Sequence, residues 1–237
     1  MMDNNWEDKG RYWITTKEQL SDFWHLARIG RITGSKIGGL VGHSKFSDPI
    51  ITAREISGTY KSAKGFSSRA LMEHGVTTEP HARRWFSNHI GKDVEELGLA
   101  VPKWNFKFGV SVDGIIDDHC ICEIKAPKKM YAPLKDHRKR ISKGEIFDKY
   151  YHTHIWDNHY DQMQLGMAVT GARKCYYIVY VSSTENPSIP LDVYCECILF
   201  NVEYWNKLYS IANSRYDELI APIMKDYKIV RLDPKVK

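Results

Sequence analysis

Two acids and a lysine stand inside an otherwise strand-like run, "SVDGIIDDHCICEIKAP", at residues 111–127. Asp113, Glu123 and Lys125 occupy positions where a buried strand would prefer apolar side chains. Paired carboxylates are oxygen ligands for hard divalent cations, and an ammonium beside such a cation can stabilise charge that develops on a phosphate. These residue types therefore indicate metal-assisted phosphodiester hydrolysis, provided that the fold brings them together.

A β-hairpin would do so. Residues 107–116 and 120–126 are the predicted strands, and the intervening "DDH" is a turn signal. In this register Asp113 lies opposite Glu123, and the alternation of side chains puts Lys125 on the same face as Glu123. Two carboxylates that face each other repel, and a bound Mg²⁺ or Mn²⁺ would remove that conflict.

The alternative is an exposed hairpin edge on which the acid and the lysine form a surface ion pair of little consequence. The register pairs Ile116 with Cys120, and Glu123 stands between Ile121 and Ile124. Such apolar neighbours favour a buried strand over an exposed edge.

The elements that must position this hairpin follow from periodicity and from capping signals. Helices are predicted at residues 14–30, 33–42, 67–91, 156–170 and 201–224. Strands are predicted within residues 94–127 and at 174–183 and 192–200. This order predicts one α/β domain over residues 1–237, with a central mixed β-sheet flanked by helices.

Three details of these helices can be checked. Thr15 or Thr16 is the predicted cap of the first helix, with an acid or amide at positions 18–19 completing a capping box. Pro80 marks a possible break in the third helix. Gly171 is the predicted end of the helix at residues 156–170.

Composition fits a folded protein that can meet an acidic partner. The hydrophobic content is 43%, the net charge is +5 and the pI is about 8.8. No apolar run is long enough for a membrane helix, and the polar start "MMDNNWEDKGRYW" lacks the core of a secretory signal. We therefore expect an intracellular protein that acts in the cytoplasm or nucleus of a cell.

Much of the positive charge follows the predicted hairpin directly. Between positions 125 and 143 the basic residues are Lys125, Lys128, Lys129, Lys135, Arg138, Lys139, Arg140 and Lys143. A run of this kind is usually a solvated face. Its place after the candidate strand favours a surface that lies along DNA and binds phosphates without reading sequence.

Five cysteines and a group of histidines invite a second metal interpretation. The odd cysteine count and the two C-x-C pairs are a poor disulfide framework and a poor zinc motif, so we expect reduced thiols. His152, His154 and His159 have no helical ligand spacing, and aromatic-rich segments often hold a structural histidine. Contact with DNA is a further alternative for them.

The hairpin residues and three flanking blocks resemble those of a known family. Asp113 followed by Glu123-Ile124-Lys125 fits the D…(D/E)-x-K pattern of the PD-(D/E)XK nucleases, with Val112 in place of the usual proline. Three flanking blocks resemble those of the phage lambda-type 5′→3′ exonucleases, the YqaJ viral recombinase family. They are "WHLARIGRITGSKIG" from Trp24, "MEHGVTTEPHAR" from Met72 and "YDQMQLGMAVTG" from Tyr160, in the family's order.

The resemblance implies a restriction-endonuclease-like fold and a role for each matching residue. The implied metal ligands are Asp113, Glu123, the backbone carbonyl of Ile124 and Glu79. Lys125 would be the catalytic lysine, and Gln162, rather than Gln164, would orient water or substrate. The implied 5′-phosphate site consists of Arg28 and Ser35, with Arg31 adding charge. Ser35 also stands near a helix start, where free N–H groups attract phosphate, and Arg supplies a bidentate fork.

Two of these residues have a purely structural alternative. Glu79 is also an acid of a helical turn, and Arg28 is also a cation that suits a helix C-terminus.

The implied activity is a Mg²⁺-dependent 5′→3′ exonuclease on double-stranded DNA ends, with Mn²⁺ able to substitute. It would leave 3′ single strands for recombination or genome processing. The family forms toroidal homotrimers and works with a single-strand annealing protein. An endonuclease on the same core and a catalytically silent nucleic-acid-binding module are the alternatives. Iron–sulfur relatives place a cysteine ahead of the core, whereas the first cysteine here is Cys120, so we expect no cluster.

Overall fold

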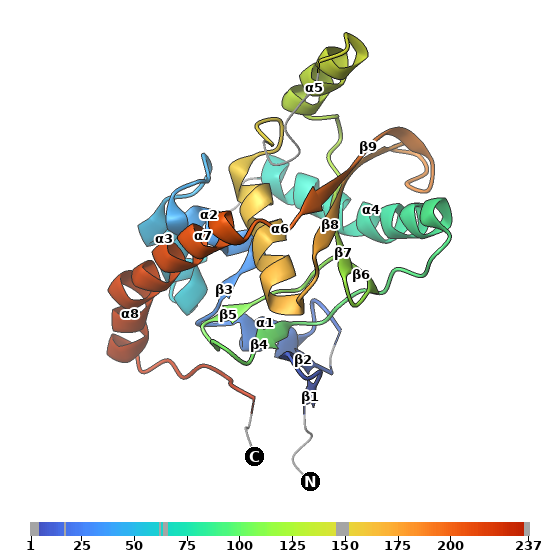
Figure 1. The fold of residues 1–237 in the computed structure, drawn as a ribbon. Helices are drawn as coiled ribbons and strands as arrows, with labels where there is room; N and C mark the ends of the chain where they lie inside the picture. Colours follow the sequence, from blue (N-terminus) through green and yellow to red (C-terminus); the bar gives the residue numbers. More distant parts are fainter. Residues whose placement is uncertain (1–4, 17, 62, 64–65, 146–151, 235–237) are drawn as a thin grey trace.

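A four-stranded mixed sheet forms the centre of the computed structural model, which describes residues 5–16, 18–61, 63, 66–145 and 152–234 (Figure 1). The strands are β6 (Gly114–Asp117), β7 (Cys120–Lys125), β8 (Lys174–Ser182) and β9 (Pro190–Leu199), in the order β6-β7-β8-β9. β7 and β8 are parallel, and the two outer pairs are antiparallel. The predicted α/β fold with a mixed central sheet is confirmed.

Alternating side chains of β7 pack against helices on opposite faces of this sheet. Cys122 and Ile124 are buried with Phe86 of α4 (Phe66–Ile90). Ile121 is buried on the other face with Met163 of α6 (Asp157–Thr170). Glu123 and Lys125 therefore belong to the face that α6 covers.

Two small sheets and the remaining helices surround this core. The first small sheet contains β1 (Trp6–Asp8), β2 (Tyr12–Thr15) and β4 (Ala100–Pro102), and the second pairs β3 (Ile32–Thr33) with β5 (Phe108–Gly109). The other helices are α1 (Asp22–Arg28), α2 (Gly34–Val41), α3 (Pro49–Ser57), α5 (Ala132–Ser142), α7 (Val202–Arg215), the π-helix η1 (Tyr216–Ile220) and α8 (Ala221–Asp226). In Figure 1 α5 stands away from the layers, at the far end from the two termini. None of the helices that the structure describes is long and apolar enough to cross a membrane.

The hairpin departs from the predicted register at its turn. Gly114 pairs with Cys122, which agrees with that register, but Asp117 rather than Ile116 pairs with Cys120. A bulge between Ile115 and Asp117 absorbs the extra residue. The first strand is also shorter than predicted, because Phe108–Gly109 turns aside to pair with β3.

The caps and ends of the helices agree only in part with those predicted. Ser21, not Thr15 or Thr16, caps α1, because Thr15 ends β2 and its hydroxyl accepts a hydrogen bond from the Leu99 N–H at 2.9 Å. α4 continues through Pro80 without a break. Gly171 ends α6 in the left-handed conformation, as predicted. α3 and α5 were not predicted, and residues 146–151 of the aromatic-rich segment lie outside the described residues.

Candidate active site

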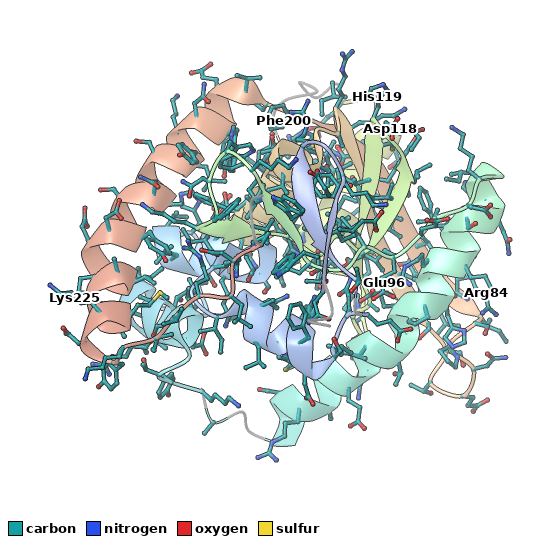
Figure 2. The ribbon with its side chains drawn as sticks, turned by 90° about the horizontal axis from the view of Figure 1, so that it is seen from below. Arg84, Glu96, Asp118, His119, Phe200 and Lys225 are labelled. Atoms are coloured by element: carbon teal, nitrogen blue, oxygen red, sulfur yellow. The ribbon has the colours of Figure 1, made fainter. Side chains whose placement is uncertain are left out.

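The candidate catalytic residues lie at the end of the hairpin opposite its turn. Figure 2 shows Asp118 and His119 of the turn, and Phe200 after β9, gathered at one edge of the molecule. Asp113 immediately precedes β6, and Glu123 and Lys125 end β7, so the chemistry is carried by the other end of both strands. The Ile124 N–H donates a hydrogen bond to Asp113 Oδ2 at 2.7 Å and holds that carboxylate against β7.

Lys125 connects the second carboxylate to α6. Its ammonium donates hydrogen bonds to Glu123 Oε1 and to Gln162 Oε1, the latter at 3.1 Å. Glu123 is 3% exposed, so this is a buried ion pair rather than the surface pair of the alternative interpretation. The structure thus brings Asp113, Glu123, Lys125 and Gln162 together, as the sequence predicted.

The two glutamines of α6 have different surroundings. Gln162 lines a cavity that is also lined by Asp113 and Glu123. The buried Gln164 instead donates to the Leu199 carbonyl at 3.0 Å and accepts from the Asn201 N–H at 2.9 Å. Gln164 therefore fixes the end of β9 to α6. Residues two apart on a helix do not face the same way, which explains the difference.

Arg83, which the sequence interpretation did not single out, joins Glu79 to the hairpin. Its guanidinium donates to the Asp113 carbonyl at 2.6 Å, to Glu79 Oε1 at 2.6 Å and to Glu96 Oε2 at 3.0 Å. Glu96 and Arg84 lie on opposite sides of α4 in Figure 2. The i,i+4 spacing of Glu79 and Arg83 was a readable signal for their pair, but the bond to Asp113 was not.

The acids of this site repel one another. Burial, and then the charge of Asp113, raise the pKa of Glu123 to about 8 against the opposing effect of Lys125. The same two causes raise the pKa of Glu79 to about 7, with Arg83 opposing them. Burial also raises the pKa of Asp113. Three carboxyl groups with raised pKa values mark a place that favours additional positive charge.

Lys125 remains protonated here. Burial acts to lower the pKa of its ammonium, but the charges of Glu123 and Asp113 outweigh burial and raise that pKa above its ordinary value. Lys125 is therefore a hydrogen-bond donor and a fixed positive charge at neutral pH, not a general base.

A cavity of about 210 Å³ joins this cluster to the predicted phosphate site. Its lining residues are Gln19, Trp24, Arg28, Gly34, Ser35, Val110, Ser111, Val112, Asp113, Glu123, Gln162 and Gly166. α2 approaches α6 closely because its first residue is glycine: a Cβ on Gly34 would lie 2.9 Å from Gln162 Cγ. This close approach sets Ser35 beside the acids.

Arg28 spans the gap between α1 and the start of α2. Its guanidinium donates to Ser35 Oγ at 3.2 Å and to Thr33 Oγ1 at 3.3 Å, and lies 4.0 Å from the centre of the Trp24 ring. Burial lowers the pKa of Arg28 to about 10, which leaves it charged at neutral pH. α2 begins at Gly34 without an acid in its first turn, so its free N–H groups add to this positive end.

Arg31 is not brought into the cavity. It is 1% exposed and donates to the Leu232 carbonyl at 2.8 Å and to Asp233. Arg31 therefore fixes the C-terminal segment to α1, and the expectation that it adds charge to the phosphate site does not fit this placement.

The three histidines that invited a metal interpretation separate into two groups. His159 is buried and contacts the Tyr177 hydroxyl at 2.8 Å, and burial followed by the Lys125 charge lowers the pKa of His159 to about 2. It is a neutral structural histidine. His152 and His154 instead lie beside Glu196 of β9, at 3.2 and 2.6 Å. All five cysteines are free thiols.

Comparison with known proteins finds a family whose model matches more than half of the chain. The model of the YqaJ-like viral recombinase domain matches residues 23–173. Comparison with curated protein sequences gives no match.

Two solved exonucleases share the fold. An alkaline exonuclease from Laribacter hongkongensis superposes with a TM-score of 0.63 at 22% identity, covering 88% of this chain and 97% of that one. The same enzyme in complex with dAMP gives 0.62 over 88% and 98% of the two chains, also at 22% identity. A phage-related exonuclease from Haemophilus somnus 129PT gives 0.53 at 14% identity, over 81% of this chain and 96% of that one.

Proposed function

Because the chain belongs to the YqaJ-like viral recombinase domain family, we propose that it is a Mg²⁺-dependent exodeoxyribonuclease that digests double-stranded DNA from its 5′ ends. One observation carries the proposal: a single cavity is lined both by the acids Asp113 and Glu123 and by the cation Arg28 with its hydrogen-bonded neighbour Ser35. The first group suits hydrolysis of a phosphodiester, and the second suits a terminal phosphate.

The donor groups fit a hard divalent cation. Asp113 and Glu123 both line one cavity, and burial raises both of their pKa values despite the nearby charge of Lys125, which favours a further cation beside them. Mg²⁺ would be held by these two acids, by the Ile124 carbonyl and by Glu79, directly or through water. Mn²⁺, which accepts the same oxygen ligands, would substitute. When bound, the cation polarises the phosphate and lowers the pKa of a bound water.

The side chains around the acids have distinct tasks in this proposal. Lys125, protonated and fixed between Glu123 and Gln162, holds the attacking water and stabilises the charge that develops on the phosphate. Arg83 fixes Asp113 through its carbonyl and so positions the site without touching substrate. Water attacks phosphorus, the bond from phosphorus to the 3′ oxygen breaks, and the leaving oxygen takes up a proton.

This bond cleavage explains the second half of the cavity. Breaking the bond to the 3′ oxygen releases a 5′-mononucleotide from the end and leaves a free 3′ hydroxyl on it. A 5′-phosphate stays on the next nucleotide of the strand, so each cycle regenerates the group that Arg28 and Ser35 would bind. The similar Laribacter enzyme has been solved with dAMP, a nucleotide that carries such a phosphate, and this supports the assignment.

The wider roles follow from the family resemblance and are proposed with it. The product would be a duplex with 3′ single strands, suited to recombination or genome processing with a single-strand annealing protein. The working form would be a homotrimer of one-domain chains, acting on DNA in the cytoplasm or nucleus of a host cell. The basic residues of α5 would contact the phosphates of the duplex.

The test is digestion of linear duplexes with 5′-phosphate or 5′-hydroxyl ends, beside a closed circle of the same sequence. We expect the linear duplexes to be degraded in Mg²⁺, faster with 5′-phosphate, and to survive in EDTA. Cleavage of the circle would instead establish an endonuclease on this core. Binding of duplex without cleavage of any substrate would establish a silent binding module.

A further inference from the structure

A second cluster of titratable side chains lies on the same face of the central sheet as the catalytic acids. Glu123 pairs with Tyr177 on β8, and Tyr177 pairs with Glu196 on β9, so the two glutamates belong to one row across the sheet. Because β8 lies between β7 and β9, the backbones at Glu123 and Glu196 are two strand spacings, or about 10 Å, apart. Tyr177 is 1% exposed and separates the two places.

Two segments bring three imidazoles to Glu196. His137 comes from α5, where the buried residues are His137 and Leu134. His154 and His152 come from the segment that precedes α6. One ligand atom each from His137, His154 and Glu196 can be chosen so that all lie within 4.8 Å of one another.

The contacts within this cluster are close. His154 Nε2 lies 2.6 Å from Glu196 Oε2, and the rings of His137 and His154 are stacked with centroids 3.6 Å apart and planes within 4°. The Tyr194 hydroxyl donates to Glu196 Oε2 at 2.6 Å and orients this carboxylate, as partners of metal ligands do.

His152 supplies a second, independent observation. Its side chain is 6% exposed, and its Nδ1 lies 3.2 Å from Glu196 Oε1. Despite that short distance the atom lacks the geometry of a hydrogen bond, and among the described residues it has no hydrogen-bond partner. A buried ring nitrogen that lies beside a carboxylate without a hydrogen bond to it is poorly explained by packing alone.

We propose that His137, His154 and Glu196 form a transition-metal site, suited to Zn²⁺, with His152 as the nearest further donor. Two nitrogen donors and one carboxylate select Zn²⁺ over Mg²⁺, which prefers an all-oxygen environment. Neutral imidazole is the form that binds metal, so Zn²⁺ binding at this site would weaken at acid pH. Ligand atoms around tetrahedral Zn²⁺ lie about 3.3 Å apart, so the His154–Glu196 pair needs to open by less than about 1 Å. The lone pair of an imidazole nitrogen lies in the plane of its ring, so binding also requires one of the two stacked rings to rotate.

The site would fasten the basic helix to the sheet. α5 stands away from the main body in Figure 1. It is also attached to β9 by Arg138, which donates to Asp192 at 2.7 Å and to the Val193 carbonyl. A metal bound by His137 and Glu196 would add a second attachment one residue away on α5. This inference does not depend on the proposed nuclease activity.

The experiment is a Zn²⁺ titration of untagged, metal-stripped protein in excess Mg²⁺, followed by competition with a chromogenic zinc chelator. We expect one Zn²⁺ per chain. Glu196→Gln and His154→Ala should lower the Zn²⁺ affinity at least about 100-fold. Zn²⁺ should raise the melting temperature of the wild type but not that of Glu196→Gln.

Matched controls locate the ion. His119→Ala removes an exposed turn histidine and Glu123→Gln alters the catalytic acids, so both should bind Zn²⁺ like the wild type. His137→Cys keeps a metal ligand and should retain binding that His137→Ser loses, which decides the case if His154→Ala does not fold. The proposal is overturned if the wild type binds no Zn²⁺, if Glu196→Gln binds as tightly as the wild type, or if Glu123→Gln abolishes binding.

Discussion

Glu123 and Glu196 stand in the same row of the same sheet face, with Tyr177 between them, yet their pKa values move in opposite directions. Burial acts to raise the pKa of both carboxyl groups. At Glu123 the charge of Asp113 adds to burial and the pKa rises to about 8. At Glu196 the imidazoles of His152 and His154 and the Tyr194 hydroxyl outweigh burial, so the pKa falls below its ordinary value.

The difference shows that the groups around a buried carboxylate, rather than its burial, decide the direction of its pKa shift and the kind of cation it suits. At the catalytic acids the repulsion between carboxylates and burial outweigh the charge of Lys125, which suits a hard cation and a phosphate substrate. Glu196 is surrounded by nitrogen donors, which suits a borderline metal such as Zn²⁺. Substitutions in each cluster, and conditions that add or remove the cation, test this contrast.

Lys125→Ala should reduce the rate of DNA cleavage the most, by about 10³-fold or more. The substitution removes the ammonium that Glu123 and Gln162 hold over the cavity. Single-turnover digestion of a linear duplex measures the rate, and a filter-binding assay should show duplex binding retained. Lys207→Ala, which alters an exposed lysine of α7, is the control and should cleave normally. A Lys125→Ala protein as active as this control would remove the catalytic role from the hairpin.

Glu123→Gln should stabilise the metal-free protein at neutral pH, by on the order of 1–2 kcal/mol. Ionised Glu123 repels Asp113, and the raised pKa means that the fold prefers a neutral group there. Because that pKa is raised above the unfolded value, this acid destabilises the protein increasingly as pH rises from about 4.5 towards 8. Urea unfolding in EDTA measures the change.

In Mg²⁺ the wild type should instead be the more stable of the two proteins. The cation should raise the melting temperature of the wild type and leave that of Glu123→Gln nearly unchanged. Destabilisation by Glu123→Gln in EDTA would mean that the ion pair with Lys125 outweighs the repulsion between the acids.

Arg28→Ala should abolish the preference for 5′-phosphate over 5′-hydroxyl ends, a loss of about 10-fold in relative rate. The guanidinium is the charged member of the phosphate site, and Ser35 supplies a neutral donor beside it. Competition between the two kinds of end in one reaction measures the preference. Ser35→Ala should weaken it less. An Arg28→Ala enzyme that keeps the full preference would place the phosphate elsewhere.

His43 provides the smallest effect, because it is partly exposed and lies outside both clusters. A hydrogen bond to Asp161, 2.9 Å away, raises the pKa of His43 above 6.5, although burial opposes the rise. The stabilisation is complete below pH 6.5 and is lost as pH rises through the raised value. The side chain is 35% exposed, so we expect under about 0.5 kcal/mol. Unfolding from pH 6 to 8 should show this slope in the wild type and not in His43→Gln.

Short-range sequence patterns predicted the hairpin and α6. Period-two alternation gave the hairpin, so Glu123 and Lys125 could be placed on one face of a strand, and helical periodicity ended by Gly171 gave α6. That Gln162 of this helix belongs to the same site was implied only by the family resemblance. α5 was missed because Leu134 and His137 are its buried residues, too few to show a periodic apolar face. The start of α1 was misplaced because Thr15 is committed to a distant partner, Leu99.

Long-range contacts account for the rest. Nothing in the sequence shows that Arg83 reaches the Asp113 carbonyl, or that Arg31 is buried against Asp233. His154 and Glu196 meet because β9 is the strand that follows β8 in the sheet, an arrangement that no short motif reveals.

The most direct test of the central claim asks which strand of a duplex is lost. The substrate is a linear duplex closed by a hairpin at one end and carrying a 5′-phosphate at the other, with a separate internal label in each strand, digested in Mg²⁺ for a single turnover. We expect release of nucleotides from the strand that carries the 5′-phosphate, an intact complementary 3′ strand next to it, and no release with Lys125→Ala. Loss of label from the strand with the 3′ end first, or equal loss in wild type and Lys125→Ala, would contradict it.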